Sequence, residues 1–182
     1  NGRDRSGWIF QQLLKLSCDT LVKEKRYFIV DSDTILVSPH SFIKGGKYVF
    51  LHSEEWHGQY FKSFKKIFGY ESNNTLSYTA HMMIFDCDRL REMKKWTVGL
   101  YGKTWDKVYL ATIDQKENSC VSDYDTYANW MKINYPKEFS VTTFYNTALP
   151  REALLTLPNL IRMYSGRYKY LSFHHYKNEK TE

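Results

Sequence analysis

The sequence contains little cysteine for its length of 182 residues. Cys18, Cys87 and Cys120 are odd in number and widely spaced, and none of them belongs to a CxxC pair. This pattern fits free thiols better than a disulfide scaffold, and it argues against a zinc site built on thiolates. Free thiols fit a reducing compartment, so we expect a cytoplasmic protein.

Long apolar stretches are also missing. No uninterrupted apolar run approaches the roughly 18 residues that a membrane-spanning helix needs, and no signal peptide is recognisable. The sequence has no repeats, no low-complexity segment and no composition typical of an interdomain linker. We therefore expect residues 1–182 to form a single domain with a sizeable core. Because the first residue is Asn1 rather than Met, we expect this domain to be part of a longer chain.

Positive charge and aromatic rings are abundant instead. The net charge of +6 favours an anionic partner such as phosphate, nucleic acid or an acidic membrane face, and it allows peripheral membrane association. Lys and Arg are scattered, however, and no fingerprint of a nucleic-acid-binding module is present, so nucleic acid is not the expected partner. Aromatic residues make up 17% of the chain, which indicates either a large aromatic core or ring-lined grooves for sugars.

Strand-like and helix-like segments alternate along the chain, which predicts an α/β fold. Residues 27–30 form a short strand that is apolar on both faces, as is typical of the centre of a parallel sheet. Further strands are expected at 47–53, 79–86, 139–145 and 168–177, and helices at 7–22, 54–70, 88–96, 104–116, 122–136 and 151–164. The expected architecture is a mixed, mostly parallel, Rossmann-like sheet flanked by helices.

Two carboxylates directly follow the first predicted strand, in the sequence YFIVDSDT. Asp31 and Asp33 would lie at the carboxyl edge of the sheet, where open α/β sheets bind ligands. Because like charges oppose each other's ionisation, a cation, a proton or a substrate should neutralise the pair. Two oxygen ligands on one short turn suit Mg²⁺ or Mn²⁺, particularly when phosphate oxygens complete the shell. A capped turn is the structural alternative, because Asp is frequent in turns.

Other candidate site residues come from later parts of the sequence. The predicted helix at 122–136 begins with SDYD, in which Asp125 fits a capping role and Asp123 is free to act as a general base. His174 and His175 follow the last predicted strand. Adjacent strand residues point to opposite faces, so only one of these histidines is expected to join the acidic pair.

The remaining candidates have strong structural alternatives. Lys177 carries a charge suited to phosphate but lies close to the last residue. His81 stands at the entry of an apolar strand, where a core histidine is the default interpretation. Gln12, near the start of the first predicted helix, is a candidate for flanking a nucleotide. Ser32, between the two aspartates, is a candidate for substrate binding.

The ordered set YFIVDSDTIL, TAHMMIFD, SDYDTYANWM and SFHHYK resembles GT-A-fold glycosyltransferases. The resemblance runs from about Gly7 to Lys177 and is nearest to bacterial enzymes of cell-surface polysaccharide synthesis. It implies a nucleotide-sugar donor, a glycan or lipid-linked acceptor, and Mn²⁺ or Mg²⁺ on the donor diphosphate. Asp31 and Asp33 would be the metal motif, with Asp33 as the more direct ligand.

The same resemblance implies roles for the later motifs. Asp123 would be the base of an inverting enzyme, with Asp125 as second choice, and His174 or His175 would complete the metal shell. His81 would lie near the donor or acceptor sugar. One feature departs from the family: a single predicted helix precedes the DxD strand, where GT-A enzymes have two or three βα units. We therefore expect the N-terminal nucleotide-binding units to be missing.

Two other function classes remain open from the sequence. A phosphatase of the haloacid dehalogenase type also begins with an apolar strand that ends in DxDx(T/V), and there Asp31 would be the nucleophile and Asp33 the acid and base. The later Lys and paired acids of that class are not evident. A basic, aromatic nucleic-acid-binding module is the non-enzymatic alternative, because rings interleaved with cations suit single strands.

Overall fold

The computed structural model describes residues 4–53, 55–72, 76–117, 119–143 and 146–174. The helices are α1 (Ser6–Ser17), α2 (Gly58–Phe68), α3 (Cys87–Tyr101), α4 (Trp105–Ala111), α5 (Asp123–Asn134) and α6 (Leu157–Tyr164), with short 3₁₀ helices at Cys18–Thr20 and Arg151–Thr156. The strands are β1 (Arg26–Val30), β2 (Thr34–Leu36), β3 (Ile43–Lys44), β4 (Lys47–His52), β5 (Met82–Asp86), β6 (Phe139–Thr143), β7 (Asn146–Pro150) and β8 (Tyr170–His174). None of the helices in these ranges combines the length and apolar character that a membrane span requires.

The prediction of a GT-A-like, mostly parallel sheet is wrong. The described strands form short sheets of two or three strands, ordered β1-β5, β2-β8-β7 and β3-β4-β6. β1 pairs with β5 antiparallel, and the only parallel pairs among the described strands are β4 with β6 and β7 with β8. The architecture is therefore a small α/β fold with mixed and antiparallel sheets.

The apolar run in β1 led to the wrong expectation because its two faces have different environments. Tyr27 and Ile29 pack against the main core. Phe28 and Val30 point the other way and are 40% and 43% exposed, and the Phe28 ring contacts Phe42 in the segment before β3. An antiparallel edge pairing suits a strand with one solvated face, whereas a central parallel strand would be buried on both.

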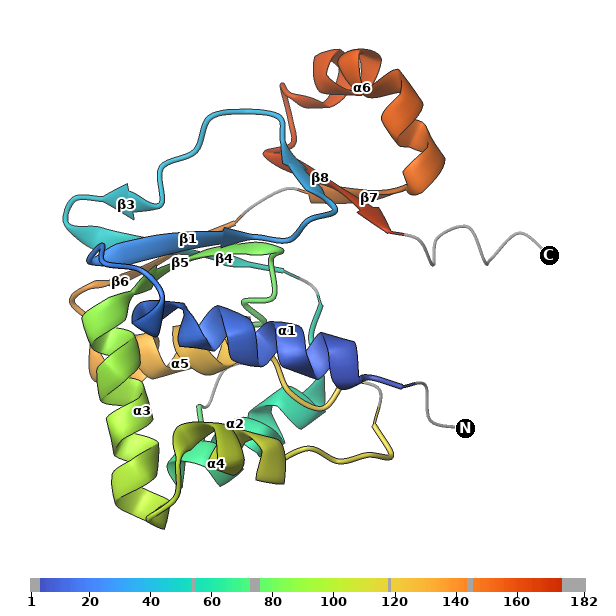
Figure 1. The fold of residues 1–182 in the computed structure, drawn as a ribbon. Coiled ribbons are helices and arrows are strands. Elements are labelled where there is room, and N and C mark those ends of the chain that lie inside the picture. Colours follow the sequence, from blue (N-terminus) through green and yellow to red (C-terminus); the bar gives the residue numbers. More distant parts are fainter. Residues whose placement is uncertain (1–3, 54, 73–75, 118, 144–145, 175–182) are drawn as a thin grey trace.

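The helices α1 to α5 cover one face of the layer that β1, β5, β4 and β6 form (Figure 1). The core between them is rich in aromatic rings, which accounts for much of the aromatic content. Phe85 and Tyr127 lie 4.6 Å apart between ring centroids, and Phe68 lies 5.2 Å from Trp130. Such ring pairs are stabilised by their offset geometry in addition to the apolar area that they bury.

A second, smaller core lies away from these helices. β2, β7 and β8 pack with α6 and the 3₁₀ helix before it, around Leu171 and Phe173. This C-terminal unit stands at the far end of the strand layer in Figure 1, beyond the point where β1 leads into β2. The DSD turn between β1 and β2 therefore lies at the junction of the two cores.

Several helix boundaries match the local sequence signals. α3 begins after Asp86, whose Oδ1 accepts the backbone N–H groups of Asp88 and Arg89 at 3.0 and 3.1 Å. α5 begins after Ser122, whose Oγ accepts the N–H of Asp125 at 3.1 Å. Both caps satisfy N–H groups that a helix start leaves without partners.

Candidate active site around the DSD turn

The DSD turn is held in place by neighbouring backbone on two sides. The N–H of Asp31 donates to the carbonyl of His81 at 2.8 Å, and the N–H of Thr34 donates to the carbonyl of Asp31 at 3.0 Å. The N–H of Phe173 in β8 donates to the carbonyl of Asp33 at 2.8 Å. Both carboxylates therefore project from a fixed backbone rather than from a free loop.

Asp31 is neutralised by side chains of the protein itself. Its Oδ1 lies 2.6 Å from the Lys15 ammonium of α1 and accepts the Tyr124 hydroxyl at 3.0 Å, and its Oδ2 lies 3.3 Å from Nδ1 of His81. Burial raises the pKa of Asp31, but the His81 hydrogen bond and the Lys15 charge lower it more, so the net pKa lies below the ordinary value. Asp31 is thus ionised, and its charge is balanced without a metal ion.

Asp33 has a different environment and a different partner. Its Oδ2 lies 3.0 Å from Nδ1 of His174 in β8. The Asp33 side chain is 41% exposed, whereas the His174 side chain is 10% exposed. The imidazole of His81 lies beside this pair, with its ring centroid 5.2 Å from that of His174. Asp33 is therefore the more accessible of the two motif carboxylates.

Asp123 contributes a third carboxylate from the first turn of α5. It is 4% exposed, and its Oδ2 lies 3.4 Å from the Lys15 ammonium. Burial raises the pKa of Asp123 to about 6, although the nearby Lys15 charge acts to lower it. Burial also lowers the pKa of Lys15, but Asp123 and Asp31 raise it more. A carboxyl group that titrates near neutral pH is suited to accept a proton.

Asp125 serves the fold rather than the same site. It accepts hydrogen bonds from the Ser77 hydroxyl at 2.8 Å, the Tyr78 backbone N–H at 2.8 Å and the Thr79 hydroxyl at 3.2 Å. These bonds tie the start of α5 to the segment that leads into β5. None of these contacts is with Asp31 or Asp33, so the geometry favours Asp123 over Asp125 as a base.

These side chains surround one cavity of about 540 Å³, which we call the DSD cavity. It contains the predicted residues Asp31, Ser32, Asp33, His81, Gln12, Asp123 and His174. Of the other predicted residues, Asp125 does not line this cavity, and His175 and Lys177 lie outside the described part of the chain. The other residues of the lining are Arg5, Trp8, Gln11, Lys15, Glu55, Tyr60, Thr79, Ser119, Ser122 and Tyr124.

Lys15 is the main residue that the sequence interpretation missed. It lies on α1 three positions after Gln12, and positions three and four apart share a helix face. Gln12 was recognised as a candidate, so the same face of the helix could have indicated Lys15. The contact with Asp31 itself spans 16 residues and depends on how α1 packs over β1.

A family assignment follows from comparison of the sequence with known families. The profile of a family of unknown function, DUF6492, matches residues 2–164. The chain belongs to this family. A comparison with curated proteins gives no match. The matched segment of the DUF6492 protein includes Lys15, Asp31, Asp33 and Asp123 but ends before His174.

The donors of the DSD cavity fit a divalent cation in part. Asp33 and His174 present an oxygen and a nitrogen 3.0 Å apart, and this combination suits Mn²⁺. Within the described ranges of this DUF6492 protein, no group of three or more His, Cys, Asp or Glu side chains is arranged to hold a metal ion. A cation between Asp33 and His174 would therefore need oxygens from a ligand or water to complete its shell.

His81 adopts a backbone conformation that non-glycine residues avoid. Its φ angle is 57°, which lies in the left-handed region, where a Cβ atom costs about 1–2 kcal/mol. Such strain often marks a functional site. Here the strained residue accepts the Asp31 N–H and directs its ring at the Asp31 carboxylate.

We expect the His81→Gly variant to be more stable than His81→Ala by about 1 kcal/mol. Both variants lose the imidazole, so their difference reports the backbone strain that only glycine relieves, less the larger conformational entropy that glycine loses on folding. Urea unfolding of the two variants measures it. A more stable alanine variant would show that residue 81 is not strained in solution.

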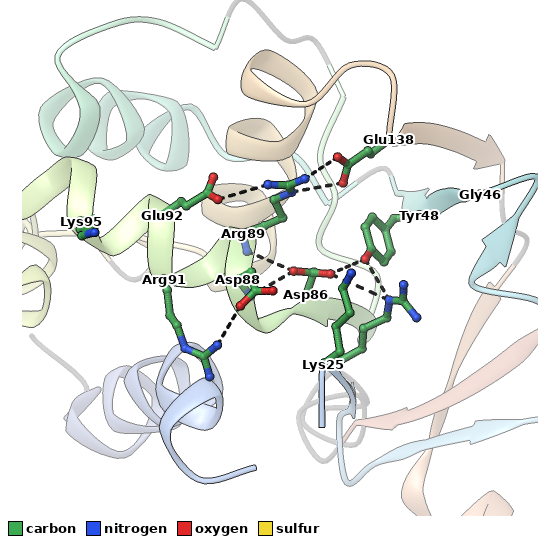
Figure 2. A pocket seen from close by; sticks show the side chains of 11 residues that line it. Lys25, Gly46, Tyr48, Asp86, Asp88, Arg89, Arg91, Glu92, Lys95 and Glu138 are labelled. Carbon is green, nitrogen blue, oxygen red and sulfur yellow. Dashed lines mark hydrogen bonds and ion pairs between the residues drawn. The ribbon is translucent and has the colours of Figure 1, made fainter. Parts of the chain in front are cut away.

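A larger cavity of about 750 Å³ lies at the other end of β1 and β5 (Figure 2). Its charged side chains largely pair with one another. Arg89 donates to both carboxylate oxygens of Glu138, at 2.6 and 3.2 Å, and Arg91 donates to Asp88 at 2.9 Å. Asp86 caps α3 and accepts the Tyr48 hydroxyl. In this DUF6492 protein these pairs give the charged residues of the larger cavity a structural role, so the DSD cavity is the better candidate site.

Proposed function

We propose that this protein is a metal-dependent glycosyltransferase that moves a sugar from a nucleotide-diphosphate sugar to a hydroxyl group. The observation that carries the proposal is the set of side chains that line the DSD cavity. The accessible Asp33–His174 pair lies on one side, and Asp123, a buried carboxyl group with a raised pKa, lies on another. Glycosyl transfer needs both a means to stabilise a leaving diphosphate and a base for the acceptor hydroxyl.

Asp33 and His174 would hold Mn²⁺ or Mg²⁺, whose charge neutralises a diphosphate as it leaves. Lys15 keeps Asp31 ionised and in place, and Asp31 in turn orients His81. Asp123 takes the proton of the acceptor hydroxyl. The volume of about 540 Å³ is in the range of small-molecule sites, and its polar lining suits a sugar rather than an apolar ligand.

The proposed partners are a nucleotide-sugar donor and a glycan or lipid-linked acceptor, as in the synthesis of surface polysaccharides. The three cysteines are free thiols, which suits the reducing environment of the cytoplasm. The net charge of +6 suits a peripheral position at the inner face of an anionic membrane.

The phosphatase alternative is less consistent with the same geometry. A nucleophilic aspartate must approach phosphorus with a free carboxylate oxygen. Both oxygens of Asp31 are engaged, by Lys15 and Tyr124 on one side and by His81 on the other. The site therefore restrains Asp31 where a nucleophile should be accessible.

We expect a nucleoside diphosphate to bind in the presence of Mn²⁺, and Asp33→Ala to weaken this binding at least about 100-fold, because charged metal ligands contribute several kcal/mol. Calorimetry with and without Mn²⁺ measures the effect. Asp88→Ala is the matched control, because it removes an exposed carboxylate on the other cavity.

Undiminished, metal-independent binding in Asp33→Ala would contradict the proposed role of Asp33. Release of phosphate from phosphomonoesters, with Asp31 trapped by fluoroberyllate, would replace the glycosyltransferase proposal by the phosphatase one. Both assays use the same preparation, so the two function classes are separated directly.

A further inference from the structure

One wall of the DSD cavity is a face of helix α1. Arg5, Trp8, Gln12 and Lys15 follow one another at intervals of three, four and three residues, so their side chains share one side of the helix. The Lys15 ammonium is already engaged by Asp31 and Asp123. Gln12, one turn earlier, has hydrogen-bonding capacity that the described residues do not use.

The orientation of the Gln12 amide is fixed by two donors. Its Oε1 accepts the Tyr109 hydroxyl at 2.7 Å and the backbone N–H of Asp123 at 2.9 Å. Because a backbone N–H can only donate, the atom that the Asp123 N–H meets must be the oxygen, and the NH₂ group must be the other end. Gln12 is 2% exposed, and its Nε2 has no acceptor among the described residues. A buried donor without an acceptor is costly, and such groups are rare in folded proteins.

An unused acceptor belongs to the residue to which Gln12 is bonded. Oδ2 of Asp123 is buried and has an ion pair with Lys15 at 3.4 Å, but among the described residues it has no hydrogen-bond donor. Gln12 and Asp123 both line the DSD cavity, one with a donor on α1 and the other with a carboxylate acceptor at the start of α5, and neither of these atoms has a hydrogen-bond partner among the described residues. The Oε1 bond to the Asp123 backbone keeps these two residues adjacent.

The chemical group that complements this pair is a hydroxyl. A hydroxyl oxygen accepts from an N–H while its proton is donated to a carboxylate. A carboxylate or phosphate of a ligand would be repelled by Asp123, and an ammonium group has no lone pair for Gln12. The pair thus selects an alcohol function over either kind of ion.

We propose that Gln12 Nε2 and Asp123 Oδ2 together bind the acceptor hydroxyl of a sugar. The inference rests on the proposed function and assigns the acceptor its place in the cavity. The hydroxyl oxygen bonds to the anomeric carbon of the donor, and its proton passes to Asp123. The bond from that carbon to the diphosphate breaks, and its electron pair leaves on the diphosphate oxygen. Gln12 holds the attacking oxygen while Asp123 takes the proton.

The variant that tests this role is Gln12→Glu. Glutamate keeps an oxygen for Tyr109 and for the Asp123 N–H, so it preserves the contacts that hold α1 to α5. It replaces the NH₂ donor by an oxygen that cannot donate when ionised, and it brings a second carboxyl group beside Asp123, so binding is compared at alkaline pH, where both carboxyl groups are ionised. Gln12→Met is less informative, because it also leaves the Tyr109 hydroxyl and the Asp123 N–H without an acceptor.

The probes are methyl β-glucoside, methyl β-galactoside and methyl α-mannoside, added to the protein with a nucleoside diphosphate and Mg²⁺. The side-chain NH₂ signals of Gln12 in ¹⁵N-labelled protein, assigned by their loss in Gln12→Glu, report directly on Nε2. We expect one glycoside to shift these signals and to leave those of the exposed Gln115 unchanged. We expect Gln12→Glu to bind that glycoside about tenfold more weakly, with its affinity for the diphosphate retained.

Two results would overturn the inference while the diphosphate still binds. One is that none of the three glycosides shifts the Gln12 NH₂ signals, and the other is that Gln12→Glu binds the glycoside as tightly as the wild type. If the wild type binds no diphosphate with Mg²⁺ or Mn²⁺, the proposed function fails instead. In that case a glycoside that shifts the Gln12 signals still supports the hydroxyl site.

Discussion

Lys15→Met is expected to lower the free energy of unfolding by about 3–5 kcal/mol at neutral pH. Methionine has a similar length but removes the ammonium that lies 2.6 Å from Asp31 and 3.4 Å from Asp123. Both carboxylates are largely buried, so their ionised forms would lose their main compensating charge. Urea unfolding followed by circular dichroism measures the loss.

The control for this variant is Lys65→Met. Lys65 and Glu71 form an ion pair of similar length, 2.7 Å, but both side chains are 59% exposed. Water and side-chain freedom make such a pair almost neutral for stability, so the control should unfold like the wild type. If Lys15→Met and the control had the same free energy of unfolding, the contacts of Lys15 with Asp31 and Asp123 would contribute nothing to stability.

The loss in Lys15→Met should also depend on pH. At acidic pH Asp123 becomes protonated, so the variant no longer holds two uncompensated carboxylates and its deficit should shrink. The double variant Lys15→Met/Asp123→Asn should for the same reason recover part of the lost stability at neutral pH. Additive effects in this double-mutant cycle would show that Lys15 and Asp123 are not coupled.

Asp123→Asn is expected to reduce glycosyl transfer by about 10²- to 10⁴-fold, the usual contribution of a general base. Wild-type turnover should rise with pH through about 6, because burial raises the pKa of Asp123 to about 6 and only the ionised form accepts a proton. The residual activity of the variant should lack this rise. The measurement is the pH profile of turnover with a sugar nucleotide whose diphosphate binds in calorimetry.

As the pH rises, the contribution of Asp123 to the free energy of unfolding should fall, whereas turnover should rise. The pKa of Asp123 is about 6 in the folded protein and about 4 in an unfolded chain. The stabilising effect of its protonated form is complete below about pH 4 and is lost as the pH rises through about 6. A difference of roughly two pH units corresponds to about 3 kcal/mol. Asp123→Asn should therefore be at least as stable as the wild type above pH 6.

Asp125→Asn is the matched control for this variant. Its pKa is also raised to about 6 by burial, but it bonds Ser77, Tyr78 and Thr79 instead of facing the acidic pair. We expect it to lose about 1–3 kcal/mol of stability and to keep the turnover of each folded molecule. If Asp125→Asn lost turnover and Asp123→Asn kept it, Asp125 would be the base and Asp123 the structural residue.

The sequence was most informative where function depends on short local motifs. The apolar strand that ends in DSD, the cap at Ser122 and the histidine at the end of β8 could be recognised because each is a signal within a few residues. The structure brings Asp33 and His174 together although 141 residues separate them. The position of the histidines after the last predicted strand led to the expectation that one of them joins the acidic pair, and the family resemblance gave it a place in the metal shell.

The sheet and the neutralising charges were harder to predict. After Arg26, strand β1 is apolar, and nothing in its five residues indicates that β5 pairs with it antiparallel. The neutraliser of Asp31 was expected to be a cation, a proton or a substrate, and in the protein it is the side chain of Lys15. A lysine on an amphipathic helix looks like any solvated residue until the packing of α1 against α5 places it.

The junction position of the DSD turn has a consequence for folding. Asp31, Lys15 and Asp123 belong to elements around the main core, whereas His174 lies on β8, which packs in the smaller core with β7 and α6. Closing a loop of 141 residues costs conformational entropy before the new contacts form. Once docked, β8 is buried at all five residues, and its Tyr170 packs on Leu51 and Met82. The Asp31 half of the site should therefore assemble early, while the Asp33–His174 half forms late. The Asp33–His174 pair then exists only in the complete fold.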